Sequence, residues 1–97
     1  GGIRFFNSGN LNNQLKYVII TQAGGNGFHG FPKANILLSS RSLFGLPAIP
    51  SYVSISESEI LNSANYGVWV ADDSRADIDK ETVFYSGNIN EDYKKGF

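Results

Sequence analysis

Short runs of β-branched and aromatic residues alternate with polar, glycine-rich stretches along the whole chain. Residues 15–21 form the strongest run, and its centre is apolar on both faces, which is typical of an interior strand. Residues 52–56 alternate regularly, which places Val53 and Ile55 on one face of a strand. The same pattern predicts further strands at residues 3–6, 66–71 and 82–86.

The stretches between these runs are less uniform. We expect the last two strands to pair as a long-looped hairpin across residues 72–81, a polar connector. Ser56 and Glu59 have the spacing of a helix capping box, which predicts a short helix over residues 57–63. Residues 33–44 fit either a helix or a strand. A strand over 34–39 is favoured, because serine and asparagine side chains compete for the backbone hydrogen bonds of a helix.

These elements amount to five or six short strands with no internal repeat. The predicted fold class is therefore all-β, a sandwich or small barrel with at most one or two short helices, and the alternative is α+β. A chain of 97 residues corresponds to one domain, residues 1–97. Because the chain contains no methionine and begins with two glycines, we expect a mature cleavage product or, preferably, a domain of a longer protein.

Charge and composition exclude several classes of function. The net charge is -1 and the eight basic residues are scattered, so no patch exists that would replace the counterions of a nucleic acid. Cysteine is absent, which excludes disulfides and thiolate metal sites. No apolar run is long enough for direct membrane insertion by this segment. Only 18% of the residues are charged, and the low-charge exterior that this implies is typical of an extracellular, cell-surface or virion protein.

A glycine-rich loop over residues 22–33 follows the strongest strand. It lacks the spacing of dinucleotide- and phosphate-binding loops, so we expect no cofactor there. Aromatic side chains on a polar loop favour docking onto another molecule, and the predicted partner-binding loop consists of Phe28, His29 and Phe31. His29 is the only histidine, and the acidic residues of 72–81 are interrupted by Arg75 and Lys80. We therefore expect neither a metal site nor a catalytic set of residues.

Aromatic residues on the predicted strands suggest a second kind of site. Sugar-binding faces present exposed rings to the apolar faces of sugars, next to polar side chains that bind hydroxyl groups. The candidates for a glycan-binding face are Tyr52, Tyr66 and Trp69, which asparagine-rich loops flank. Packing in a core is the alternative for these rings.

A third pattern consists of Arg4, the pair at residues 39–40 and the triplet Glu57-Ser58-Glu59. An arginine, a serine-containing strand and a Glu-x-Glu triplet in this order resemble the pattern of ADP-ribosyltransferase toxins. The resemblance implies that Glu59 would orient the nicotinamide ribose of NAD and that Arg4 would hold the cofactor. The middle strand lacks the threonine found in that family.

The favoured function is non-catalytic. Aromatic residues make up 13% of the chain, which exceeds what one small core requires, and Phe28, Phe31, Phe44 and Phe97 are the candidates for exposure. We therefore expect a structural or interaction module that assembles with itself or with a partner protein, in an extracellular, pilus-like or virion-type assembly. The alternatives are a carbohydrate-binding module and an ADP-ribosyltransferase-like toxin domain.

Overall fold

Ten short β-strands and their connections make up the described part of the chain. The computed structural model describes residues 2–22, 33–42, 44–71 and 73–96. The strands are β1 (Ile3–Phe6), β2 (Gln14–Lys16), β3 (Ile19–Thr21), β4 (Ala34–Ser39), β5 (Tyr52–Ser56), β6 (Ser58–Leu61), β7 (Tyr66–Val70), β8 (Arg75–Ile78), β9 (Val83–Ser86) and β10 (Tyr93–Lys95). The prediction of an all-β fold is confirmed, and the described residues contain no helix.

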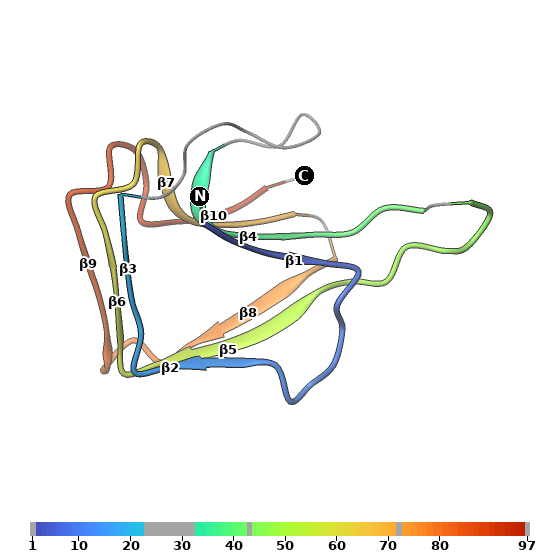
Figure 1. Cartoon of the computed structure of the whole chain (residues 1–97), viewed down its shortest axis with the longest axis horizontal. Helices are drawn as coiled ribbons and strands as arrows, with labels where there is room; N and C mark the ends of the chain where they lie inside the picture. The colour runs from blue at the N-terminus through green and yellow to red at the C-terminus, as the bar shows by residue number, and fades with distance from the viewer. Residues whose placement is uncertain (1, 23–32, 43, 72, 97) are drawn as a thin grey trace.

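These strands form three sheets in which the strand pairings are parallel (Figure 1). Sheet A has the order β1-β4-β7-β10, sheet B the order β2-β5-β8, and sheet C the order β3-β6-β9. The chain thus visits the three sheets in turn, and each strand pairs with the strand one circuit earlier and one circuit later. This is a three-sided parallel β-helix, with three complete coils and a fourth that begins at β10. The arrangement of the strands is therefore neither the sandwich nor the small barrel that the sequence predicted.

The core lies inside the coils, where alternate side chains of all three sheets meet. Its buried members are Ile20, Ile36, Leu38, Val53, Ile55, Ile60, Val68, Val70 and Val83. The alternation predicted for β5 is confirmed, because Val53 and Ile55 are both buried. A second, smaller cluster lies on the other face of sheet A, where Leu37 of β4 and Trp69 of β7 occupy paired positions.

The run at residues 15–21 is two strands, not one interior strand. Tyr17 has a positive φ of 60°, which turns the chain between β2 in sheet B and β3 in sheet C. Both strands lie at the edges of their sheets, because they belong to the first coil. The apolar residues on both faces arise because Ile20 points into the core while Ile19 points outward.

The helix predicted over residues 57–63 is also wrong, since β6 occupies residues 58–61. Glu57 has a positive φ of 47° and makes the same corner as Tyr17 one coil later. Ser58 Oγ donates to the carbonyl of Ser56 at 2.7 Å and accepts a hydrogen bond from Val18 N at 3.3 Å. The Ser58 hydroxyl therefore links the second coil to the first.

The hairpin predicted from residues 66–71 and 82–86 does not form. β7 pairs with β4 and β10, and β9 pairs with β6, all in parallel. The predicted polar connector between these strands is more than a loop, because it contains β8, which extends sheet B. Ala76 and Ile78 supply the inward side of β8 and pack against the core. The strand predicted at residues 34–39 is confirmed as β4.

Corners of successive coils repeat the same backbone conformation. Gln22, Asn62 and Gly87 end the three strands of sheet C with φ values of 54°, 52° and 69°. At the corner that precedes sheet B, the amide of Ser8 donates to Ser51 Oγ at 3.0 Å, and the amide of Ser51 donates to Ser74 Oγ at 2.9 Å. These columns are the structural repeat that the sequence did not reveal.

Candidate functional site

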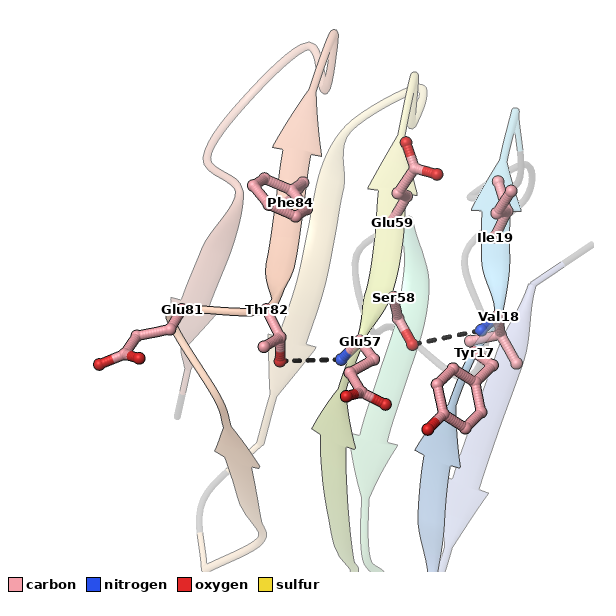
Figure 2. Close-up of a pocket in the computed structure, with 9 residues that line it drawn as sticks. All are labelled: Tyr17, Val18, Ile19, Glu57, Ser58, Glu59, Glu81, Thr82 and Phe84. Carbon is pink, nitrogen blue, oxygen red and sulfur yellow. Dashed lines mark hydrogen bonds between the residues drawn. The ribbon is translucent and has the colours of Figure 1, made fainter.

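A shallow groove of about 710 Å³ lies outside the corner between sheets B and C. Each of the three coils contributes to it, and the lining residues are Tyr17, Val18, Ile19, Glu57, Ser58, Glu59, Glu81, Thr82 and Phe84 (Figure 2). Ile19, Glu59 and Phe84 occupy paired positions on β3, β6 and β9, so their side chains stand side by side on the outer face of sheet C. We call these nine residues the sheet C groove.

The apolar side chains of the groove are open to solvent. Tyr17 is 75% exposed, Ile19 66% and Phe84 63%. The inward neighbours of the last two, Ile20 and Val83, are buried. The exposure therefore follows from strand alternation, since a strand with apolar residues at successive positions presents one of them to water. These side chains belong to the first and third coils, on either side of Glu59 of the second. Exposed apolar side chains gathered on one face are a feature of interaction surfaces.

The charge of the groove is negative. The described residues that line it include the carboxylates of Glu57, Glu59 and Glu81 and no cation. Lys16 lies next to it and pairs with Glu57, with 3.8 Å between Nζ and Oε2. Both side chains of this pair are largely exposed, so it contributes little to stability.

The corner that supports the groove is well ordered by hydrogen bonds. The amide of Glu57 donates to Thr82 Oγ1 at 2.9 Å (Figure 2). Thr82 Oγ1 in turn donates to Asp79 Oδ2 at 3.0 Å, and Asp79 Oδ1 accepts from the amide of Glu81 at 3.1 Å. Asp79 thus organises the turn between β8 and β9, and its carboxylate is used for this structural purpose.

A second hollow, of about 620 Å³, lies where the core is open at the last coil. Its lining includes Ala76, Ile78, Tyr85 and Tyr93, and the first three of these pack against the core inside the coils. Burial raises the pKa of Tyr85 to about 12, with a smaller contribution from the charge of Asp92. Burial likewise raises the pKa of Tyr93, so both phenols stay protonated at neutral pH.

A projecting arm lies between β4 and β5. It comprises residues 41–49, of which residue 43 lies outside the described residues, and its described members are all exposed. In Figure 1 the arm extends from one end of the molecule, and sheet C forms the opposite end. Phe44 is 98% exposed, as the sequence predicted, and Leu46 and Ile49 are 67% and 51% exposed.

The base of the arm is fixed by one side chain. Asn7 Nδ2 donates to the carbonyl of Arg41 at 3.0 Å, while Asn7 Oδ1 accepts from the amides of Arg41 at 2.9 Å and Ile49 at 3.3 Å. Asn7 has a positive φ of 50° at the end of β1, which directs its amide toward both legs of the arm. The apolar tip is therefore carried on an anchored base.

Of the residues predicted from the sequence for partner or glycan binding, the structure describes only the three proposed for glycan binding, and it does not bring them together. Phe28, His29 and Phe31 lie outside the described residues. Tyr52 lies in sheet B, whereas Tyr66 and Trp69 lie in sheet A, so the three rings do not share a face. Trp69 is only 3% exposed and packs with Leu37, and Tyr66 packs against the same cluster.

Tyr52 takes part in a network on the outer face of sheet B. Its hydroxyl donates to Asp77 Oδ2 at 2.8 Å, and the Arg75 guanidinium lies 4.9 Å from the centre of its ring. Arg75 Nε is 3.3 Å from Asp77 Oδ1. The hydrogen bond to Asp77 raises the pKa of Tyr52. This network pairs Asp77 with two neighbouring side chains of the same sheet.

The residues of the ADP-ribosyltransferase-like pattern lie on different sheets. Arg4 is on the outer side of β1 in sheet A, where its guanidinium lies 5.1 Å from the centre of the Phe6 ring. Glu57 and Glu59 line the sheet C groove, and Ser39 is fully buried at the end of β4. Within the described residues, no group of three or more histidine, cysteine or acidic side chains could hold a metal ion.

Two apolar residues of the groove could be recognised from the sequence, but only once the fold is known. Ile19 and Phe84 each stand beside a second large apolar residue in a short strand, so one member of each pair must face outward.

The described residues form no helix that could cross a membrane. Comparison with protein-family models, curated proteins and solved structures finds no match for this chain.

Proposed function

We propose that this chain is a non-catalytic interaction module that assembles with further copies of itself or with a partner protein. The observation that carries the proposal is the sheet C groove, where Tyr17 and Ile19 of the first coil and Phe84 of the third coil remain exposed. Apolar surface of this kind is stabilised when a partner covers it. The parallel β-helix holds Ile19, Glu59 and Phe84 in register, so the surface is preorganised for binding.

The chemistry of the groove supports binding rather than catalysis. Its carboxylates lie in a shallow, open depression, where water screens their charges. The low charge of the surface supports an extracellular, pilus-like or virion-type setting for the assembly.

The test is a pair of measurements on the wild-type chain and the variant Phe84→Ser. We expect the wild type to form oligomers, or to retain a partner protein in pull-down experiments, and the variant to do so at least about tenfold less well. Light scattering over a wide concentration range measures the first property. A chain that stays monomeric and retains no partner would contradict the proposal.

Carbohydrate binding is a second candidate, favoured by the exposed rings of Tyr17 and Phe84 beside the carboxylates of the same groove. Aromatic faces pack against sugars, and carboxylates accept hydrogen bonds from hydroxyl groups. A glycan array would support this function if binding disappeared in Tyr17→Ala while the fold remained intact. Binding that is unchanged in this variant would count against the groove as a glycan site.

A further inference from the structure

The arm and the sheet C groove are complementary surfaces at opposite ends of the molecule. We infer that the arm of one copy docks into the sheet C groove of a second copy, so that the chain assembles head to tail. This inference rests on the proposed function and names its partner, which is a second copy of the chain. It depends on an apolar match, on charge and on geometry.

The apolar match is between two groups of exposed side chains. The arm presents Phe44, Leu46 and Ile49, and the groove presents Tyr17, Ile19 and Phe84. Strands in a sheet lie about 4.8 Å apart, so the three-stranded face spans about 10 Å between its outer strands. The tip of the arm, which carries the three apolar side chains, is the part that would lie on this face. Docking would remove both groups from water at once.

Charge favours this pairing over the packing of two identical faces. A two-fold contact between two sheet C faces would bring Glu57, Glu59 and Glu81 of each copy close to the same residues of the other. Like charges in such an interface are unfavourable. The arm carries no acidic residue, and Arg41 at its base is exposed and cationic. The arm is therefore the better counterpart for the acidic groove.

The positions of the arm and the groove allow the same contact to repeat from copy to copy. The arm and sheet C lie at opposite ends of the longest axis of the molecule (Figure 1), which measures 40 Å. A copy whose arm is bound still has a free groove, and a copy whose groove is filled still has a free arm. Contacts between two different surfaces generate rings or open filaments rather than closed dimers. Because the contact involves only a short arm, each link is weak and the oligomers grow with concentration.

The experiment uses two variants that each disable one surface. Phe44→Ser removes the tip of the arm and leaves the groove intact, whereas Phe84→Ser damages the groove and leaves the arm intact. Sedimentation velocity at high protein concentration should show a series of oligomers for the wild type. Each variant alone should associate at least about tenfold more weakly. An equimolar mixture of the two should form a one-to-one heterodimer that does not extend, because only one functional arm–groove pair remains.

A charge variant and a control complete the design. Glu59→Arg should weaken association, and combining it with Arg41→Glu should restore part of the loss, by up to about fivefold at low salt. Leu11→Ser changes an exposed apolar residue in the turn after β1 and should leave association unchanged. Circular dichroism and thermal unfolding establish that every variant is folded.

The outcomes separate the inference from the proposed function. A heterodimer in the mixture supports the arm–groove contact. Oligomers that persist in Phe44→Ser but not in Phe84→Ser would show a groove that binds itself by another route, which overturns the inference and leaves the proposed function standing. A wild type that is monomeric at every concentration also overturns the inference. In that case retention of another protein by the groove still supports the proposed function, and its absence contradicts both.

Discussion

Gly87 and Asn62 stack at the same corner of successive coils, and they are so close that a side chain on the glycine would have to displace the Asn62 side chain. A Cβ atom on Gly87 would lie 2.1 Å from Asn62 Oδ1, and both residues have a positive φ. Glycine is therefore favoured at this end of the sheet C corner column for two reasons, its freedom at positive φ and the nearness of the Asn62 side chain.

Gly87→Ala is therefore expected to destabilise the fold by about 2–3 kcal/mol, of which about 1 kcal/mol comes from the positive φ alone. Gly45→Ala is the matched control, because Gly45 has a φ of 77° and a Cβ atom added there would meet nothing within 4 Å. Urea unfolding measures the difference between the two. Adding Asn62→Ala should recover part of the cost at Gly87, and a strictly additive double mutant would contradict the steric explanation.

The serine column predicts a cost for a buried hydroxyl. Ser51 is 1% exposed, and its Oγ donates to the Ser39 carbonyl at 2.7 Å while accepting from the amide of Ser8. Ser51→Ala would leave the Ser8 amide without this acceptor, at a cost of about 1–3 kcal/mol in the free energy of unfolding. Ser54→Ala, on the outer side of the adjoining strand β5, should cost less than half as much. Equal losses in the two variants would show that the column contributes nothing specific.

Burial of Trp69 makes it a structural residue. Trp69→Ala is expected to lower the free energy of unfolding by about 3–5 kcal/mol, because it removes most of the apolar cluster on the outer side of sheet A. Phe84→Ser, which changes an exposed ring, should cost at most about 1 kcal/mol. Thermal unfolding followed by circular dichroism compares the two. A stable Trp69→Ala variant would indicate that this cluster is dispensable.

Alkaline pH should weaken the open end of the core. The pKa of Tyr85 is raised from its usual 10.0 to about 12 in the folded chain, so the folded state holds this proton more tightly than the unfolded state. Stability from this group is complete below about pH 10 and is lost as the pH rises toward about 12. Tyr85→Phe should remove this part of the alkaline decline, whereas Tyr17→Phe should not. The measurement is urea unfolding as a function of pH, and an identical decline in both variants would refute the assignment.

Part of the fold could be predicted from local pattern alone. The alternation at residues 52–56 identified β5 with its bounds, and the β-forming runs placed most of β1, β4, β7 and β9. Pairing could not be predicted, because a parallel β-helix joins strands that are one coil apart. The register spacing is 40 residues between β2 and β5 but 23 between β5 and β8, as in the pairs Ser54 with Gln14 and Asp77. Insertions in the early coils thus hide the repeat.

The candidate site could likewise be predicted from the sequence only in part. The sequence correctly placed Phe44 among the residues expected on the surface, because the aromatic content exceeds what one small core requires. It could not show that Tyr17, Glu57 and Glu81, far apart in the chain, line one groove, since that depends on corners stacked coil upon coil. Nor could it separate Trp69, which the structure buries, from Phe84, which it exposes.

Composition and periodicity by themselves determined that the chain is β-rich, that it has no cysteine chemistry and that its basic residues form no concentrated patch. These properties depend only on residue identity and on neighbours a few positions away. The tertiary structure alone decided which apolar residues remain exposed. Each strand has two faces, and only the winding of the coils determines which of them meets the core. The sheet C groove and the projecting arm both follow from that winding.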